Sequence, residues 1–432
     1  MILDVALVLV AAALFAVLAF TPKLRQSSTW TATLTPLASI MGSGFLVCGP
    51  LLAGVVGVWT PVAMAGLLAV AYGIGGAIRF NIRELERAIE KSERPSGERD
   101  ESKGDSDDAE SEHRLHRGHG TAVSTAVTRA ARTSQFVLAA AYIISVTYYV
   151  MLLAQFSLQP FGMGSGTAPT VLAVAVLGGL AAVGFFFGLA IIERIERYVV
   201  SANLAVIGSL LVGLAWHNIS LATAGRWALP DLPVLDDRWT MVRTLMGLLI
   251  VVQGFETSRY LDGHSAAERV RTMRIAQLVS AAIYLVFLSL LLPLLSRDNA
   301  SADAGVTAII GIVGVVASVL PALLTVVAAG SQFSAAAADE AGCGGLLERL
   351  VPKLTARTAY VVIGGATIAL ALLVDVMSVI ALASRAFAAF YAVQCGMAAS
   401  QAWRTQRRGL GIWFAVLTVI AIAVAALGIA SE

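Results

Sequence analysis

Charged residues are scarce in this sequence. Only 13% of the 432 residues are Asp, Glu, Lys or Arg, whereas 58% are hydrophobic and the mean hydropathy is +0.80. A chain with so little charge and so much apolar surface does not fold as a water-soluble globule. Much of its charge falls between about residues 83 and 132 and in short gaps between apolar runs. The sequence therefore predicts a multi-pass protein of the cytoplasmic membrane whose surroundings are the lipid bilayer.

Cysteine is also rare, and basic residues form no stripe. Cys48, Cys343 and Cys395 lie far apart without metal-type spacing, so neither a disulfide framework nor a metal site is expected. The net charge is +2 and no basic stretch is interleaved with aromatic residues, which gives no indication of a nucleic-acid partner. The apolar segments contain no nucleophile–base pair or metal triad, so an enzyme is not expected. No cofactor is predicted other than a coupling ion, Na⁺ or H⁺.

What the sequence does contain is long apolar runs. A membrane-spanning helix needs about 20 mostly apolar residues. We therefore predict an all-α polytopic membrane protein with about 12 transmembrane helices. Lys and Arg are concentrated in every second gap, as expected of cytoplasmic loops, which orients both termini outward. The predicted segments are 2–20, 33–57, 61–80, 134–157, 169–191, 199–217, 240–261, 272–295, 304–334, 357–375, 377–400 and 410–430.

The longest polar stretch is a predicted cytoplasmic loop at about 83–132. It has almost no apolar residue with which to offset the entropy of ordering, so we expect disorder there, flanked by short helical extensions. His113, His116 and His119 have regular spacing within it, but a flexible polar linker is the favoured interpretation over a metal-binding tract. The first apolar run, which lacks a basic leader and a small-residue cleavage pattern, is expected to be a retained helix rather than a signal peptide.

The second segment carries helix-breaking residues in its middle. "SIMGSGFLVCGP", residues 39–50, places Gly42, Ser43 and Gly44 inside an otherwise apolar run. Lipid cannot hydrogen-bond a freed backbone group, so a break at this depth must face protein or a water-filled cavity. Secondary transporters bind substrates at such breaks. Glycines in membrane helices also serve as close-packing surfaces, and on this motif alone both interpretations stay open.

A second interruption is predicted in the seventh segment. "LLIVVQGFETSRYLDG", residues 248–263, places Gln253, Gly254 and Glu256 inside the membrane. An ionisable residue at that depth costs about 2.5–3.5 kcal/mol on insertion scales, and such residues are usually functional. The two interrupted segments are five segments apart and so run in opposite directions. This offset predicts two five-helix inverted repeats that meet at a central site.

The repeats set the expected organisation of the chain. An extra N-terminal helix with a short cytoplasmic link precedes them, and a C-terminal helix follows. The expected bounds are 1–31 for the extra helix and link, 32–217 for the first repeat, 218–400 for the second repeat and 401–432 for the last helix.

These motifs resemble the amino acid-polyamine-organocation (APC) superfamily of permeases. Gly42-Ser43-Gly44-Phe45 resembles the "GSGIF"-like break in the family's first core helix, and Gly254-Phe255-Glu256 resembles an element of its sixth. "SQFSAAAADEAGCGGLLERLVPKLTARTAY" resembles the family's link into the ninth core helix. Together the matches cover about residues 32–400. The preceding helix, eleven rather than twelve core helices and the long loop depart from the common pattern, so the subfamily is left open.

The resemblance implies that substrate lies between the two breaks. The amides of Ser43, Gly44 and Phe45 would receive a carboxylate at the N-terminus of the outer half-helix. Gln253 and Gly254 would form the opposite wall. Phe255 would act as a gate, although a packing role is equally compatible with its sequence position. Glu256 would hold a proton, pair with a cationic substrate group or cap freed amides.

Further polar residues are secondary candidates. Glu256, Arg259 and Asp262 are spaced three apart on one helical face, as an ion-paired strip or as substrate contacts. Arg385 would snorkel, meet a carboxylate such as Glu256 or Asp375, or bind an anionic substrate. By resemblance, Ser331 and Ser334 lie late in the ninth segment near the place where sodium-coupled relatives bind a cation, although hydroxyls in membrane helices usually bond their own backbone. Polar residues of the fourth segment line the cavity or bond neighbouring helices: Ser145, Thr147, Tyr148 and Gln155.

The leading hypothesis is therefore a secondary-active transporter of an amino acid or related amine, working by alternating access, with oligomeric state left open. One alternative is a same-fold transporter of a metal ion or a nucleobase. Metal-transporting relatives carry an Asp-Pro-Gly-Asn element in the first broken helix, whereas "IMGSGF" offers only Met41 as a soft ligand. A different alternative is a transport-inactive sensor or scaffold that uses the 83–132 loop to bind a partner.

Overall fold

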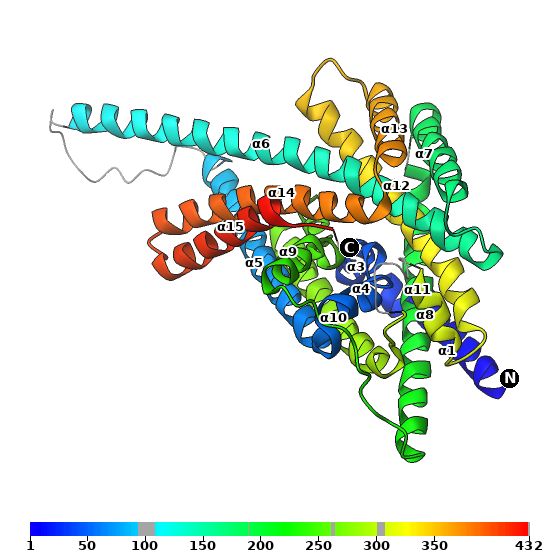
Figure 1. Ribbon diagram of the computed structural model, residues 1–432. Helices are drawn as coiled ribbons and strands as arrows, with labels where there is room; N and C mark the ends of the chain where they lie inside the picture. Colours follow the sequence, from blue (N-terminus) through cyan, green and yellow to red (C-terminus); the bar gives the residue numbers. More distant parts are fainter. Residues whose placement is uncertain (94–108, 189, 261–263, 300–306, 431–432) are drawn as a thin grey trace.

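The described residues fold into helices. A computed structural model describes residues 1–93, 109–188, 190–260, 264–299 and 307–430 (Figure 1). The α-helices are α1 (Ile2–Phe20), α2 (Pro22–Arg25), α3 (Ser28–Ser43), α4 (Cys48–Val56), α5 (Thr60–Glu93), α6 (Ala109–Leu158), α7 (Thr167–Phe187), α8 (Ala190–Thr223), α9 (Arg238–Gly247), α10 (Ala266–Leu291), α11 (Ala308–Gly314), α12 (Leu320–Leu350), α13 (Ala356–Leu373), α14 (Val376–Arg404) and α15 (Arg408–Leu427). Short 3₁₀ helices are η1 (Gly57–Trp59), η2 (Gln159–Phe161), η3 (Leu249–Val252), η4 (Phe255–Tyr260) and η5 (Leu292–Leu294).

The predicted all-α membrane fold is confirmed. Within the described residues, nine helices are long and apolar enough to cross a bilayer. The three other predicted segments have identifiable counterparts: α13 is apolar but shorter, and the second and seventh segments are interrupted helices.

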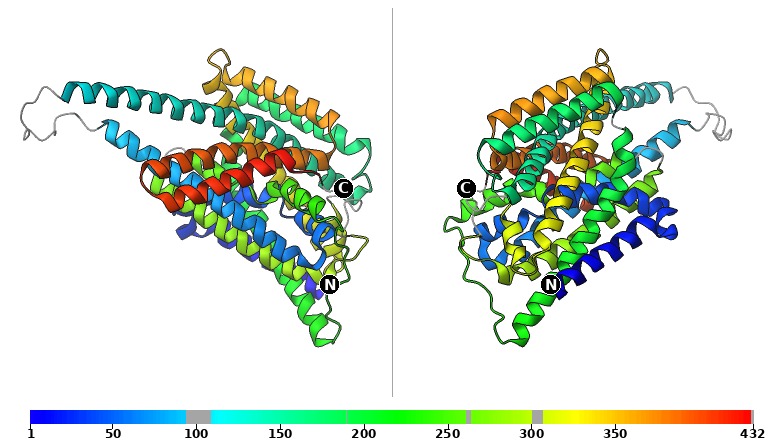
Figure 2. Two further views of the ribbon diagram at one scale, coloured as in Figure 1. Left: turned by 60° about the vertical axis from the view of Figure 1, so that its left-hand side comes forward. Right: turned by 90° about the vertical axis from the view of Figure 1, so that its right-hand side faces the viewer.

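The helical extensions predicted to flank the loop at about 83–132 are present, and they are longer than expected. Helix α5 continues to Glu93, and α6 begins at Ala109, while residues 94–108 lie outside the described residues. Local helix propensity explains the length of these extensions, because a polar stretch without apolar residues can still be helical. Residues 84–91, "ELERAIEK", consist mostly of strong helix formers, and the residues that precede the membrane part of α6 are rich in Ala. The extended α6 is visible in Figures 1 and 2.

The predicted ninth segment, 304–334, is also displaced. Helix α12 begins at Leu320, with Pro321 in its first turn where proline is tolerated, and it runs to Leu350. The short α11 precedes it. Asp339 and Glu340 lowered the hydropathy of the second half of α12, so the sequence pattern ended the segment too early.

Helices at equivalent positions of the two predicted repeats lie together. The second helices, α5 and α10, are in contact, as are the third helices, α6 and α12, and the fourth helices, α7 and α13. The α7–α13 pair is visible in Figure 1 and in the right-hand view of Figure 2. The first helices also meet, because α3 contacts η3 and η4. Such pairing is the arrangement expected of five-plus-five inverted repeats.

Helix α1 lies outside the repeats and runs along α8. The Ser209 hydroxyl of α8 donates to the carbonyl of Leu7 (2.8 Å), and Leu7 itself is buried. At the start of α1, the Asp4 carboxylate accepts hydrogen bonds from Ser318 and from the backbone N–H of Val319, just before α12. These contacts attach the extra helix to both repeats.

Helix α9, which carries the second interruption, begins at a side-chain cap. The Asp237 carboxylate accepts hydrogen bonds from the Thr240 hydroxyl and from the backbone N–H groups of Thr240 and Trp239. These bonds, that of the Thr240 hydroxyl first, lower the pKa of Asp237. The cap satisfies N–H groups that a helix start leaves free, and so it fixes where the interrupted helix begins.

Candidate functional site

The first interruption lies slightly later than predicted: Gly42 and Ser43 still belong to α3, and of the predicted Gly42-Ser43-Gly44 only Gly44 is in the break. Helix α3 ends at Ser43 and α4 starts at Cys48, so a turn at 44–47 divides one membrane segment. The freed backbone groups have partners on other helices. Gln332 of α12 donates to the carbonyl of Gly42 at 2.5 Å, and the hydroxyl of Tyr284 on α10 contacts the carbonyl of Ile40 at 3.1 Å. The interruption therefore faces protein, as a break in a membrane must.

The second interruption is also confirmed. After α9, the chain passes through η3 into the non-helical residues Gln253 and Gly254, and Gly254 has a φ of +113°, a conformation that favours glycine. Ser384 of α14 secures the junction with one hydroxyl. It accepts from the N–H of Ile250 (2.9 Å) and donates to the carbonyl of Gly247 (2.6 Å).

The two interruptions touch each other. A methyl group placed on Gly44 would lie 2.5 Å from Cα of Val251, and one on Gly254 would lie 2.5 Å from the Ser39 hydroxyl and 2.8 Å from the N atom of Ile40. Each interrupted segment thus has a glycine at the point where the backbone of the other segment comes close. The Tyr284 hydroxyl contacts the carbonyls of Ile40 and Val251 and so joins both segments.

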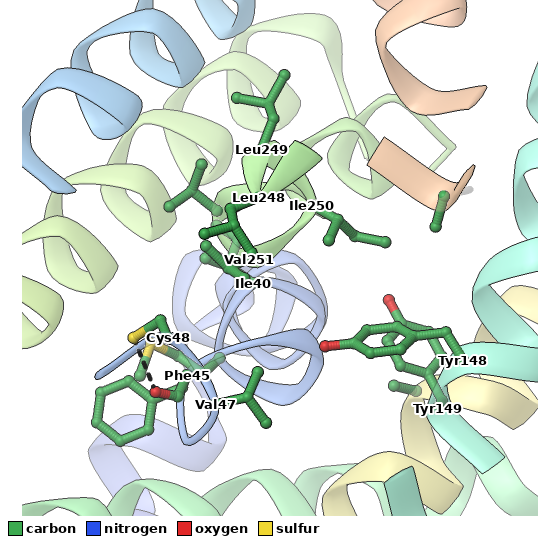
Figure 3. Packing of buried hydrophobic residues seen from close by; sticks show 14 of the residues in the cluster. Ile40, Phe45, Val47, Cys48, Tyr148, Tyr149, Leu248, Leu249, Ile250 and Val251 are labelled. Atoms are coloured by element: carbon green, nitrogen blue, oxygen red, sulfur yellow. Dashed lines mark hydrogen bonds between the residues drawn. The ribbon is translucent and has the colours of Figure 1, made fainter. Parts of the chain in front are cut away.

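Figure 3 shows this crossing from close by. Ile40 of α3 lies beside Val251 of η3, and Phe45 lies in the turn that follows. Tyr148 and Tyr149 project from α6 on the other side of the turn. We refer to the region formed by residues 39–48 and 247–256 as the crossing.

Glu256 is buried at the crossing with neutral partners. Its side chain is 1% exposed, and one carboxylate oxygen accepts from the N–H of Gly254 (3.1 Å) and from the hydroxyl of Tyr391 (2.8 Å). None of the ion pairs among the described residues includes it. The ring of Phe255 stacks on Tyr391 with centroids 5.3 Å apart. Gln253 donates to the Tyr149 hydroxyl at 3.4 Å.

The predicted face of the second interruption points to one helix. Glu256 contacts Tyr391, and Arg259 donates to the side chain of Gln394, so both partners lie on α14. The two residues of η4 are three positions apart, and so are their two partners on α14. Among the described residues, Arg259 bonds an amide, and its predicted partner Asp262 lies outside the described residues.

Arg385 does not take part in the crossing. Its side chain is exposed and donates to the carbonyl of Ala425 on α15 at 2.8 Å. The alternative that it meets Glu256 or Asp375 is wrong. Asp375 caps α14 by accepting from the N–H of Ser378 (3.0 Å). Arg385 follows Ser384, which faces the crossing, and one residue is a turn of about 100° around a helix.

Ser331 lies against the first interruption, although not late in its helix as predicted. It is in the first half of α12, where its hydroxyl accepts from Asn203 at 3.2 Å and would lie 3.0 Å from a methyl group on Gly42. Ser334 is buried on the same helix.

Phe45 packs its ring against Phe287 of α10, with centroids 4.4 Å apart. The side chain of Ser43 lies outside the described residues.

Sequence reasoning missed the supporting side chains on α10, α12 and α14. Ser384, Tyr391 and Gln394 were recognisable as a set, because spacings of seven and three place them on one face of a helix. Tyr284 gave no comparable signal, since it is a single polar group in an apolar run, whereas Gln332 stands between Ser331 and Ser334 and could have been included with them. Asp339, 4% exposed, accepts from the Ser145 hydroxyl at 2.5 Å. Among the described residues, no group of three or more His, Cys, Asp or Glu is placed to hold a metal ion.

Comparison with known proteins decides the family. A sequence model described as APC superfamily transporter matches residues 22–105 and 110–428. The chain belongs to the APC superfamily of transporters. The match of this APC transporter begins after residues 1–21 and so leaves out the extra helix α1 (Ile2–Phe20). The chain is 34% identical over 376 residues to an uncharacterized protein of Aquifex aeolicus (strain VF5), covering 86% of this chain and 84% of that protein.

Two solved structures resemble the chain at low sequence identity. The manganese transporter of Eremococcus coleocola, in complex with an aromatic bis-isothiourea substituted compound, superposes with a TM-score of 0.51 and 13% identity over 91% of this chain and 86% of that one. A Na⁺-coupled sialic acid symporter in a substrate-bound, outward-open state gives a TM-score of 0.49 and 13% identity over 100% and 98%. The first likeness supports the transporter fold. An APC transporter moves a small molecule across the bilayer in which it resides.

Proposed function

We propose that this APC transporter is a secondary-active carrier of an amino acid or related amine, which works by alternating access and is coupled to Na⁺ or H⁺. The observation that carries the proposal is the crossing of two interrupted helices beside a buried carboxyl group whose partners among the described residues are neutral. The proposed substrate site comprises Gly42, Ser43, Gly44 and Phe45 on one side and Gln253, Gly254, Phe255 and Glu256 on the other.

Glu256 supports an amine as the substrate. A buried carboxylate is stabilised by a cation at close range, and the partners that Glu256 has are an amide and a hydroxyl. A substrate ammonium group would supply the missing charge. For an amino acid, the substrate carboxylate would be received by the backbone N–H groups of the turn at 44–47, near the positive end of the α4 helix dipole.

Two sets of residues support ion coupling. For Na⁺, Ser331 and Ser334 on α12 are the proposed ligands, because Ser331 adjoins Gly42 at the end of α3. For H⁺, Glu256 is the proposed carrier, because a proton is the other way to remove its unpaired charge. The two proposals differ in the cation gradient that drives accumulation.

Uptake into liposomes tests the proposal. Purified protein is reconstituted, and accumulation of labelled amino acids, amines, nucleobases and Mn²⁺ is measured under an inward Na⁺ gradient or an inward H⁺ gradient. We expect accumulation of one amine-containing class, driven by one of the two gradients. Accumulation of Mn²⁺ or a nucleobase instead would contradict the proposed substrate class, and binding without accumulation would identify a sensor.

A charge-removing variant assigns the site. Glu256→Gln keeps the size of the side chain and its ability to accept hydrogen bonds but removes the negative charge, so we expect uptake to fall at least about tenfold, the equivalent of roughly 1.4 kcal/mol. The matched control is Glu348→Gln on α12, where the side chain is exposed, and its uptake is expected to equal that of the unmodified protein. Equal uptake by both variants would remove Glu256 from the site.

A further inference from the structure

A cavity that contains several arginines lies away from the crossing, at the basic ends of three helices. It has a volume of about 440 Å³ and is enclosed by α5, α10 and the junction of α14 with α15. Four arginines line it: Arg79, Arg83, Arg274 and Arg407. We refer to it as the arginine cavity. Helices α5 and α15, which contribute to its lining, lie against each other, as the left-hand view of Figure 2 shows.

One arginine is fixed in the wall. Arg79 is 5% exposed, and its guanidinium donates to the side chain of Gln277 and to the carbonyl of Tyr72 (3.2 Å) while it stacks over the Tyr72 ring at 4.7 Å. These partners are neutral. The side chain is therefore held in place in the cavity wall while its charge remains without a carboxylate counterpart among the described ion pairs.

The other three arginines add charge that one acid does not balance. Arg407 is 3.9 Å from the Glu84 carboxylate and lies over the ring of Phe80 at 5.8 Å. Arg83 and Arg274 are exposed, and no hydrogen bond or ion pair links either one to a residue in the described part of the chain. Both repel Arg79 electrostatically. Among the described side chains, four guanidinium groups against one carboxylate leave the cavity strongly cationic.

The rest of the cavity is apolar and open to the lipid side. Tyr72, Leu410 and Trp413 line it and are 39%, 42% and 48% exposed. All three lie on helices that are apolar and long enough to span the bilayer. A ligand that fits must therefore carry negative charge at one end and an apolar body at the other.

We propose that the arginine cavity binds the phosphate headgroup of an anionic phospholipid, with the acyl chains along α15 and α5. Guanidinium groups bind phosphate oxygens in a bidentate manner, and arginine is favoured for this purpose. The basic ends of these helices are the predicted cytoplasmic side, where anionic lipids are concentrated. Basic cavities between membrane helices on that side are a recognised type of lipid site.

The test compares two arginine pairs that carry equal charge. The full-length protein is purified in detergent, and its melting temperature is measured with added phosphatidylglycerol, phosphatidylcholine or inorganic phosphate. Arg83→Gln/Arg274→Gln removes the two unpaired cavity arginines. The control, Arg271→Gln/Arg404→Gln, removes two exposed arginines from the same helix ends that do not line the cavity.

We expect phosphatidylglycerol to raise the melting temperature of the unmodified protein and of the control, with phosphatidylcholine giving no shift. The cavity variant is expected to bind phosphatidylglycerol about 25-fold more weakly, which is about fivefold for each guanidinium group. If both double variants bound phosphatidylglycerol equally weakly, the lipid would be attracted by general surface charge and not by the cavity, which would overturn the proposal. An equal shift with inorganic phosphate would also overturn it, since the site would then be one for a soluble anion.

Discussion

Two glycines permit the close approach on which the crossing depends. Gly44 faces Cα of Val251, and Gly254 faces the backbone of Ile40, so at each position a side chain would meet main-chain atoms that cannot rotate away. Breaks of this kind are usually discussed as a source of free backbone groups. Here the absence of a Cβ atom is equally important, because it brings two interrupted backbones into contact.

Replacing Gly44 tests this residue-scale requirement. Gly44→Ala places a methyl group 2.5 Å from Cα of Val251, so the two segments must separate. Overpacking of this kind costs about 1–3 kcal/mol. We expect a lower melting temperature and a severe loss of uptake, with normal membrane insertion. Gly178→Ala on α7 is the control, since its added methyl group would meet nothing within 4 Å. Uptake by Gly44→Ala at the control level would show that the contact is dispensable.

At the scale of the helices, single hydroxyl groups hold the interruptions open. The Tyr284 hydroxyl on α10 contacts carbonyls of both interrupted segments, and Ser384 on α14 spans the α9–η3 junction. Leaving a buried carbonyl without a donor costs about 1–3 kcal/mol. Tyr284 and Ser384 thus act as positioning residues: they hold the backbone of the interruptions and contact neither Glu256 nor the proposed ion ligands.

Tyr284→Phe is the corresponding element-scale test. The substitution keeps the ring that packs against Phe45 and removes only the hydroxyl. We expect a destabilisation of about 1–3 kcal/mol and weaker substrate binding. The control is Tyr72→Phe, because the Tyr72 ring is 39% exposed and lies outside the crossing. An unchanged melting temperature for Tyr284→Phe would mean that water replaces the hydroxyl at no cost.

The sequence predicts the interruptions better than it predicts the helix limits. Gly42-Ser43-Gly44 and Gln253-Gly254 can be located in the sequence because they interrupt an apolar pattern. The ends of α5, α6 and α12 were misjudged because polar helix formers and two buried acids resemble loop in a hydropathy profile. The side chain of Arg385 points toward α15 because of the way α14 is rotated about its axis. That rotation is set by packing against helices that are distant in sequence, so the sequence alone does not predict it.

At the scale of the whole molecule, the pairing of α5 with α10, α6 with α12 and α7 with α13 places the crossing between two similar halves. Alternating access requires such halves to move against each other around a fixed site. The first interruption is held to the second repeat by Gln332 of α12, while the second is bonded to α14 and reaches Tyr149 of α6. A ligand at the crossing therefore contacts both halves and stabilises their association.

Ligand-dependent stability tests this molecular arrangement and separates the two coupling ions. A ligand that binds only the native state stabilises it by about 2.7 kcal/mol at 100 times its Kd. We expect an amine substrate to raise the melting temperature of the unmodified protein and of Glu348→Gln but not of Glu256→Gln.

If sodium is the coupling ion, added Na⁺ increases this shift, and Ser331→Ala loses the sodium increment while keeping the response to amine. A sodium increment that survives in Ser331→Ala would exclude Ser331 as a ligand. An amine shift that ignores sodium but changes with pH would assign the coupling to protons, and the charge of Glu256 would then be neutralised by a proton and by the substrate in alternate steps of transport.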